Sequence, residues 1–340
     1  MQPLLTLDRR NFLAILSAAA GTAALSTPAL AQLIAKPAVG PILSWDTIDK
    51  AGFHVMADQN TGGNTLLMTS KSQTLLIDTK FAHLAGALLA DAKTFAGPQD
   101  HFNLTLINTH HHGDHTGGNA LIVPHATAYA HTNAIDRIKS QLDRYKQGAK
   151  SAPERIKDSP FNSETTRTLA AQAADASAAW TESDITPQHQ VADQQTLTLA
   201  DTTLSMHHFG PGHTDNDLVI HFPDHNIIHT GDLVFNKLHP FFDPSANATA
   251  IGWTKSLKSI LKLCDKHTTI IPGHGQIGTT QIVQSQLDYL EQLITHVQAD
   301  IDAAVPKSES AEKTWDFMQN LGFESIRSRA IEATYDELAN

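Results

Sequence analysis

The chain has 340 residues, of which 41% are hydrophobic and 17% are charged, a composition that excludes a largely disordered protein. The formal net charge of −11 and the lack of a Lys/Arg-rich run exclude a nucleic-acid-binding function, which needs a basic face. Histidine is overrepresented, since 20 histidines stand beside 24 lysines and arginines, and this surplus points to metal chemistry. Cys264 is the only cysteine, so an intrachain disulfide is excluded, and we expect a small buried hydrophobe there.

Residues 1–31 have the features of a cleaved export signal. The paired arginines Arg9 and Arg10 precede an apolar run at 12–25, and small residues at 29–31 provide an A-x-A cleavage site. The apolar run is too short to cross a bilayer stably, because a spanning helix needs about 20 apolar residues. With the Phe-Leu pair that follows them, the arginines resemble a twin-arginine signal. We therefore expect an exported, periplasmic protein without stable membrane insertion after cleavage; an uncleaved N-terminal anchor is the alternative.

The remaining residues, 32–340, are predicted to form one domain with a core at about 52–276. Apolar and β-branched runs between turn residues predict strands at 64–69, 73–78, 103–108, 126–131, 196–199, 203–209, 217–222, 226–230 and 268–271. Helical composition predicts helices at 82–95, 117–122, 132–147 and 252–266, and C-terminal helices within about 279–338. Residues 148–185 are rich in Ala, Ser and charge and are interpreted as a helical insert. This mixture indicates sheets sandwiched between helices.

The densest group of chemically active residues follows the strand predicted at 103–108. In extended chain, residues two apart face the same way, so His110 and His112 point together and His111 points elsewhere. A glycine then lets the chain turn sharply and bring Asp114 and His115 to an adjacent face. Two imidazoles on one side, and a carboxylate with an imidazole on the other, suit two neighbouring ions. Such mixed ligands favour zinc, with iron or manganese as alternatives.

Three further candidate ligands lie where later predicted strands end. His213, Asp232 and His274 each stand beside a glycine, immediately after an apolar run. Glycine permits a tight turn and a close approach of the backbone to a metal or substrate. Because the pattern of strand, turn and ligand recurs four times along the chain, we interpret it as one site and not as chance.

The His-x-His-x-Asp-His segment, with the later His, Asp and His, resembles the signature of the metallo-β-lactamase superfamily. The resemblance spans about residues 52–276 and implies an α/β (α+β) fold, a four-layer αββα sandwich with a dinuclear metal site at one edge. It implies His110, His112 and His213 on one metal, Asp114, His115 and His274 on the other, and Asp232 as the bridge. Asp78 would match the acid that supports the histidine loop in this family, and a plain turn acid is the alternative interpretation.

The resemblance also implies a hydrolase with two Zn²⁺ per chain and a small-molecule substrate. A metal-bridging hydroxide, oriented by Asp114 as the catalytic residue, would attack a carbonyl or phosphoryl centre. β-Lactam hydrolysis is one expected activity, but the lactamases usually carry Cys or Ser where Asp232 stands. A bridging aspartate resembles hydroxyacylglutathione hydrolases, lactonases and phosphodiesterases of the superfamily. We therefore expect modest lactamase activity, and better turnover of an ester, thioester, lactone or phosphoester.

Two functions of other classes remain open from the sequence. An iron-dependent persulfide dioxygenase uses a subset of the same ligands, and a binding protein without catalysis would fit a broken site. The complete set of seven ligands disfavours the binding protein. Di-iron oxidoreductases of the same fold carry Glu where His112 stands, which disfavours them as well. The sequence predicts no oligomeric state.

Phe241 and Phe242 follow Asp232 closely and are predicted to line an apolar substrate rim, although a place in the core is an equal alternative. The insert at 148–185 is a candidate lid. Eight histidines are expected to be supporting, strand or surface residues and not ligands, because seven ligands already fill two sites. They are His111, His125, His131, His207, His208, His221, His225 and His229.

Overall fold

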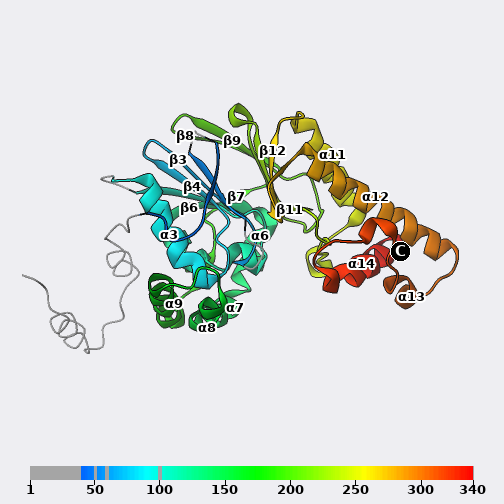
Figure 1. The fold of residues 1–340 in the computed structure, drawn as a ribbon, viewed down its shortest axis with the longest axis horizontal. Coiled ribbons are helices and arrows are strands. Elements are labelled where there is room, and N and C mark those ends of the chain that lie inside the picture. Colours follow the sequence, from blue (N-terminus) through cyan, green and yellow to red (C-terminus); the bar gives the residue numbers. More distant parts are fainter. Residues whose placement is uncertain (1–39, 50–51, 58–60, 99–101, 340) are drawn as a thin grey trace, which may run out of the picture. The chain divides into compact units, whose positions relative to one another are not determined.

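Two mixed β-sheets pack face to face in the computed structural model, and helices cover their outer faces (Figure 1). The first sheet has the order β1 (Asp46–Asp49), β2 (Phe53–Met56), β3 (Thr65–Ser70), β4 (Gln73–Ile77), β5 (Asn103–Ile107), β6 (Ala126–His131) and β7 (His189–Val191). The second has the order β13 (Gly278–Thr279), β12 (Thr269–His274), β11 (Ile227–Phe235), β10 (Val219–Phe222), β9 (Thr202–His207) and β8 (Gln194–Leu199).

The structure describes residues 40–49, 52–57, 61–98 and 102–339, all within one compact unit. The predicted export signal at 1–31 lies outside the described residues and stays a prediction. Among the described helices, none combines the length and apolarity that a membrane span requires.

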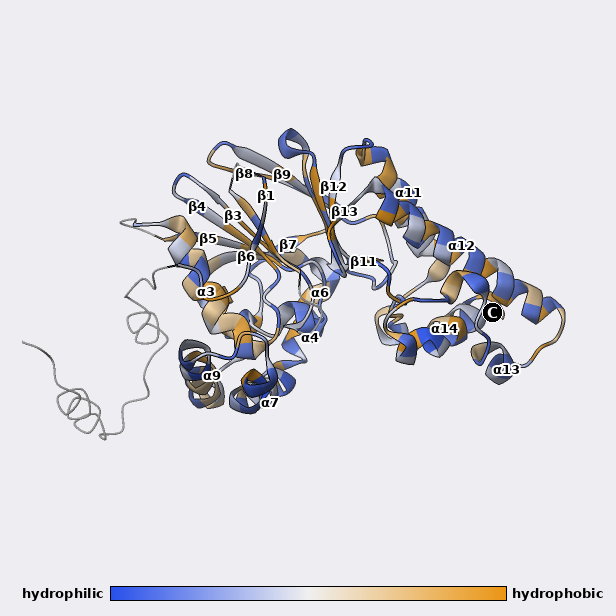
Figure 2. Cartoon of the chain, in the orientation of Figure 1, coloured by the Kyte–Doolittle hydropathy of each residue, from blue (hydrophilic) through white to orange (hydrophobic). Residues whose placement is uncertain are grey.

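The core between the sheets follows from the period of two along each strand. In β3, Leu66 and Met68 belong to the cluster between the sheets, together with Ile220 and Phe222 of β10. Leu67 points the other way, into a cluster beneath the covering helix. Strands buried on both faces are apolar almost throughout, which explains the continuous apolar runs in the sequence. Hydrophobic residues accordingly gather along the strands, while the helices alternate hydrophobic and hydrophilic stripes (Figure 2).

The outer layers complete the sandwich. Helix α3 (Ala82–Ala96) covers the first sheet, and α11 (Ala250–Leu263) and α12 (Thr280–Asp302) cover the second. The other helices are α4 (Gly113–Thr116), α5 (Asn119–Ile122), α6 (Thr132–Lys139), α7 (Leu142–Lys150), α8 (Ala152–Arg155), α9 (Glu164–Ala176), α10 (Glu182–Ile185), α13 (Lys307–Ala311) and α14 (Arg327–Ala339). This arrangement confirms the predicted αββα sandwich with C-terminal helices.

The predicted insert at 148–185 is helical and braces the first sheet from outside. Helix α9 packs on α3, where a Cβ on Gly86 would lie 3.1 Å from the Cβ of Leu169. Helix α7 reaches the histidine loop, because the hydroxyls of Tyr145 and Thr116 form a hydrogen bond. The insert thus supports α3 through α9, whereas the contact to the histidine loop comes from Tyr145, which precedes the insert.

Local predictions differ from the structure in three places. The helix predicted at 132–147 is two helices, because Gln141 leaves the helical path and its Nε2 donates to the carbonyl of His111 at 2.8 Å. Strands β1 and β7 lie outside the predicted strands; β7 has a largely polar sequence at a sheet edge, which leaves no apolar pattern to detect. Cys264 is half-buried, and its Sγ donates to the carbonyl of Ile260.

Asp91 of α3 offers a test of how the first described residues are attached. Its buried carboxylate accepts the backbone N–H of Ile42 at 2.6 Å and of Leu43 at 2.9 Å, and Nε1–H of Trp45 at 2.9 Å. Asp91→Ala leaves these donors without their acceptor, and we expect it to lower the free energy of unfolding by about 3 kcal/mol. Urea denaturation measures this loss. Asp136→Ala, whose side chain is 93% exposed, is the control and should change it by less than about 0.5 kcal/mol.

Candidate metal centre

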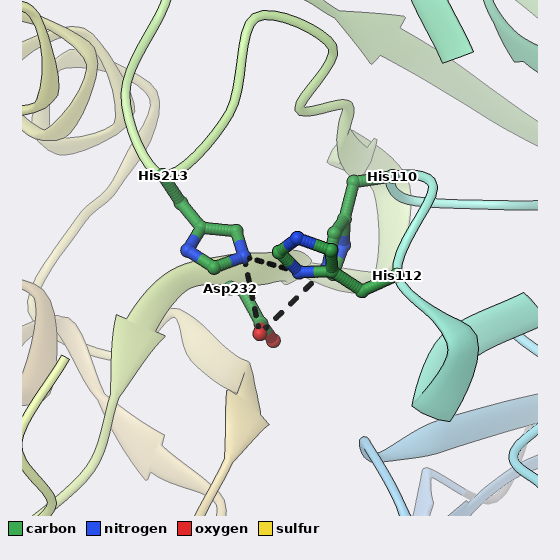
Figure 3. A group of neighbouring side chains, drawn as sticks. All are labelled: His110, His112, His213 and Asp232. Atoms are coloured by element: carbon green, nitrogen blue, oxygen red, sulfur yellow. Dashed lines mark hydrogen bonds and ion pairs between the residues drawn. The ribbon is translucent and has the colours of Figure 1, made fainter. Parts of the chain in front are cut away.

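Three histidines and one aspartate converge in the first of two ligand groups (Figure 3). Nδ1 of His112 lies 3.1 Å from Nε2 of His110 and 2.9 Å from Nε2 of His213. Oδ2 of Asp232 lies 3.7 Å from Nε2 of His110 and 3.5 Å from Nε2 of His213. Ligands about 2.0–2.1 Å from a tetrahedral zinc ion are about 3.3 Å apart. The four atoms are therefore spaced as the ligands of one metal ion would be.

The second group joins Asp114, His115 and His274. Nε2 of His274 lies 3.2 Å from Oδ2 of Asp114 and 3.4 Å from Nε2 of His115. Asp232 reaches this group too, because its Oδ1 is 3.1 Å from Nε2 of His115 and its Oδ2 is 3.4 Å from Nε2 of His274. The structure thus brings together all seven predicted ligands, with Asp232 between the two groups. Their role as ligands stays a prediction.

Strands and the turns that follow them bring these side chains to one edge of the sandwich; Asp232, predicted to follow a strand at 226–230, lies inside β11, which continues to Phe235. His110 and His112 follow β5, and the single turn of α4 carries Asp114 and His115. The pairing of β11 with β12 shifts its register at Gly231, which has a φ of +52°. A bulge of this kind re-aims the next side chain, which here is Asp232. The backbone also comes close there, because a Cβ on Gly231 would lie 2.9 Å from the Cβ of Thr109.

The outer ring nitrogens of two histidines in the first group face acceptors. Nε2 of His112 lies 2.9 Å from Oδ2 of Asp243, and Nδ1 of His213 lies 2.7 Å from the carbonyl oxygen of Phe241. Each outer nitrogen therefore carries the hydrogen and donates it. The inner nitrogens, Nδ1 of His112 and Nε2 of His213, are left with lone pairs directed into the group.

Asp78 arranges two more rings in the same way. Its Oδ2 accepts Nδ1–H of His115 at 2.7 Å and the hydroxyl hydrogen of Thr109 at 2.7 Å. Because that hydroxyl donates to Asp78, its oxygen is free to accept Nδ1–H of His110 at 3.1 Å. The lone pairs of His110 and His115 also point inward. Asp78 thus lies where the predicted supporting role requires it.

The negative charge of the carboxylates at the centre suits divalent cations. Burial by itself would lower the pKa of His274, but Asp232 and Asp114 outweigh burial and raise the pKa to about 9. The same two carboxylates, against burial, raise the pKa of His115 well above its usual value. In the first group, burial lowers the pKa of His213 to about 3. The carboxylates demand positive charge, and divalent cations would supply it in place of protons.

Aromatic side chains stand beside the ligands. The half-buried ring of Phe241 is 5.6 Å from the ring of His112, as predicted for a rim residue. Phe242, in contrast, is 2% exposed and its ring lies 5.1 Å from that of Trp253, so its prediction as a rim residue is wrong. Adjacent residues of an irregular connection point in different directions, and only one of the two faces the site. Phe323 was missed; its ring is 5.7 Å from that of His274.

Phe323 has a φ of +59°, a left-handed conformation that is uncommon for a bulky residue. Such strained positions cluster at functional sites. No signal in the sequence singles out this residue, because it lies far from the ligands along the chain, among other hydrophobic residues that pack against the core.

His111 lies outside the two groups that hold the predicted ligands, but with His112 and Asp243 it forms a third group of residues spaced as ligands. Its Nδ1 is 3.1 Å from Nδ2 of Asn216, and its Nε2 is 3.7 Å from Oδ2 of Asp243. The other histidines that we expected to be non-ligands lie outside all three groups found among the described residues. They are His125, His131, His207, His208, His221, His225 and His229. Asp243 was missed, because a single acid in a long connection carries no pattern.

A family model described as the metallo-β-lactamase superfamily matches residues 59–274, which is more than half of the chain. The chain belongs to the metallo-β-lactamase superfamily. The metallo-β-lactamase type 2 of Bacteroides fragilis is 24% identical to this superfamily member over 108 residues, which are 32% of this chain and 43% of that relative. The chain thus spans less than half the length of this curated relative.

Solved structures share the superfamily fold over more of the chain. DIM-1 metallo-β-lactamase superposes with a TM-score of 0.52 at 18% identity, over 74% of this chain and 97% of that one. The sec-alkylsulfatase Pisa1 from Pseudomonas sp. superposes with a TM-score of 0.60 at 14% identity, over 87% of this chain and 50% of that one. At such identities, the likeness shows the fold alone.

Gly273 tests whether the ligand groups are built as described. A Cβ at this position would lie 1.8 Å from Oδ1 of Asp232, so Gly273→Ala must displace the carboxylate between the groups. We expect wild-type protein to bind about two divalent ions per chain, and the variant to lose most of this binding while keeping its circular dichroism spectrum. Elemental analysis after dialysis measures the metal. Gly148→Ala is the control, since a Cβ there meets nothing within 4 Å; unchanged metal content in Gly273→Ala would contradict the described site.

Proposed function

We propose that this chain is a hydrolase that uses two divalent cations, zinc in the first place, and that prefers oxygen esters or lactones to β-lactams. The observation that carries the proposal is the place of Asp232, whose carboxylate lies within 3.7 Å of Nε2 of four candidate ligands. One carboxylate shared by two ligand groups is suited to hold two cations next to each other.

The candidate ligands would have different roles in such a reaction. When bound, paired divalent cations supply Lewis acidity and a water that is acidic near neutral pH. Asp114 is the most exposed of the seven candidate ligands, with 27% of its side chain accessible against at most 17% for the others. A water that enters the site therefore meets this carboxylate, which can accept its hydrogen bond and orient it. The remaining candidate ligands are buried, apart from the partly exposed His112, and would hold the cations.

The charge of the site supports the preference for neutral esters. An aspartate at position 232 lowers the positive charge of a metal pair. It therefore weakens the attraction for the carboxylate of a β-lactam and for an anionic nitrogen leaving group. Asp243 places a further carboxylate 2.9 Å from Nε2 of His112. The phenylalanines Phe241 and Phe323 offer apolar contact for an acyl or alkyl group beside the ligands.

We also propose that the protein acts after export by the twin-arginine route. The paired arginines Arg9 and Arg10, the apolar run at 12–25 and the A-x-A end at 29–31 support this proposal. That route carries folded proteins, so the chain can acquire its metal before export.

Substrate preference is tested with zinc-loaded protein on a panel of oxygen esters, lactones, thioesters, phosphoesters and a chromogenic cephalosporin. We expect kcat/KM for the best oxygen ester or lactone to exceed that for the cephalosporin, because of the charge of Asp232. Asp114→Asn should reduce turnover of every active substrate by at least about 100-fold, the size of effect typical of lost positioning and electrostatic groups. Cephalosporin turnover without any ester turnover would refute the preference. Iron as the dominant metal in active protein would favour the persulfide dioxygenase instead.

Phe323 tests the apolar wall. Phe323→Ala should raise KM for an ester with a long acyl or alkyl chain by about fivefold, because it removes about 1 kcal/mol of apolar contact, and should leave kcat nearly unchanged. A short acetate ester cannot reach the ring and should show no change. The control variant is Phe317→Ala, whose ring packs 5.1 Å from that of Tyr289 in the same C-terminal stretch. Equal changes in KM for long and short esters would contradict the wall.

A further inference from the structure

Asp243 makes a pair of contacts to the histidine loop that the predicted ligand set does not account for. It lies in the connection 236–249 between β11 and α11, and only 14% of its side chain is exposed. Its Oδ2 is 2.9 Å from Nε2 of His112 and 3.7 Å from Nε2 of His111. Its Oδ1 accepts the backbone N–H of Ser245 at 3.0 Å and the Ser245 hydroxyl at 2.5 Å. One carboxylate thus joins the connection to two histidines.

His111, His112 and Asp243 are spaced closely enough to suggest a third cation site, but the ring hydrogens argue against one. A neutral imidazole has one lone pair. Nδ1 of His112 directs its lone pair toward His110 and His213, so Nε2 carries the hydrogen that faces Asp243. The group therefore holds at least one N–H donor directed at its carboxylate.

His111 has the same arrangement. Its backbone N–H donates to Oδ1 of Asn216 at 3.0 Å, which identifies the other end of that amide as the donor. Nδ1 of His111 lies 3.1 Å from Nδ2 and 3.3 Å from Oδ1 of Asn216, and the shorter contact favours Nδ2 as the donor and the hydrogen of His111 on Nε2. With this tautomer both histidines direct an N–H toward Asp243, His112 at hydrogen-bond distance and His111 at 3.7 Å. The carboxylate acts as an acceptor for the histidine loop.

We propose that Asp243 is a positioning residue that fixes the tautomer and ring orientation of His112 and thereby sets the affinity of the first ligand group for a divalent cation. The inference rests on the proposed function, since it requires His112 to be a metal ligand. A carboxylate on the outer nitrogen of a liganding imidazole typically contributes about 10–100-fold to metal affinity.

Contacts on both sides of Asp243 fix the connection that carries it. On one side, Nε2 of His239 lies 3.0 Å from Oε2 of Glu324, and its backbone N–H donates to the carbonyl of Gly322 at 2.9 Å. On the other side, Nη1 of Arg137 donates to the carbonyl of Ser245 at 2.9 Å. The same connection supplies the Phe241 carbonyl that orients His213. One segment therefore orients two of the three histidines of the first group.

Two substitutions separate positioning from local folding. Asp243→Ser removes the carboxylate from His112 but keeps a side-chain oxygen that can accept the N–H of Ser245, because serine is a good cap of such turns. Asp243→Asn keeps the shape of the side chain and removes the charge. The matched control is Glu324→Gln, which weakens another carboxylate–histidine pair on the same connection, at a histidine that is not a candidate ligand.

Cobalt(II) binding tests the proposal, because Co²⁺ occupies such sites and its visible absorption reports the ligands. We expect wild-type protein to bind two Co²⁺ and both Asp243 variants to bind one of them about 10–100-fold more weakly in competition with a chromophoric chelator. The absorption of that ion should also change, whereas Glu324→Gln should match the wild type in affinity and spectrum.

Four outcomes would overturn the proposal. Unchanged affinity and spectrum in both Asp243 variants would leave the proposed function standing and remove this inference alone. An equal loss in Glu324→Gln would show that Asp243 only stabilises the connection. A third Co²⁺ in wild-type protein, lost in the Asp243 variants, would show a cation site there instead. Wild-type protein that binds no Co²⁺ would refute the proposed function and this inference together.

Discussion

Five imidazole rings and two carboxylates converge in one small volume, and each ring must turn one nitrogen lone pair toward it. The surrounding structure provides the contacts that orient these rings. An acceptor at the outer nitrogen of a ring holds the hydrogen there and directs the lone pair inward. Four of the five candidate histidines have such an acceptor, whereas Nδ1 of His274 is buried without a hydrogen-bond partner among the described residues. Asp78, Thr109, Asp243 and the carbonyl of Phe241 provide those acceptors. They come from three places along the chain, because Phe241 and Asp243 lie in the same connection. The geometry at the centre therefore depends on how the strands, the loops and the long connection are packed together.

The cluster of candidate ligands also requires that backbone segments approach the side chains closely, which only glycine allows at two positions. A Cβ on Gly63 would lie 2.0 Å from the ring of His115, and one on Gly273 would lie 1.8 Å from Asp232. Asn64 completes this approach, because its side-chain Nδ2 donates to the carbonyls of Pro272 and Gly275 at 2.8 and 2.9 Å. The turn before β3 is thus tied to the end of β12. Small residues bring the sheets close enough for ligands from both to share one volume.

The parts of the site that were predictable are those that leave a pattern in the chain. The seven candidate residues were recognised because each lies near a glycine where a predicted apolar strand ends. The ends of strands in a sandwich meet at one edge, so these residues were expected to lie together. Phe242 was assigned to the rim because its position follows Asp232 in sequence, but an irregular connection has no period that separates inward from outward side chains. The helix predicted at 132–147 is interrupted at Gln141 by a hydrogen bond to a distant carbonyl, and helix propensity does not report tertiary contacts. Asp243 and Phe323 act through contacts made only in the folded chain.

The C-terminal stretch contacts the surroundings of the site at positions that the sequence did not predict. The superfamily match ends at residue 274, yet Phe323 lies beside His274, and Glu324 holds the connection that carries Asp243 and Phe241. Gly322 pairs with Leu238 in a parallel bridge at the start of that connection. Residues beyond the matched region therefore contribute contacts beside His274 and to the connection that follows β11. The sandwich supplies the candidate ligands and some of the groups that orient them, whereas Asp243 and Phe323 come from segments packed onto it. For this reason a common fold at low identity does not imply a common substrate, and function must be argued from the residues at the site.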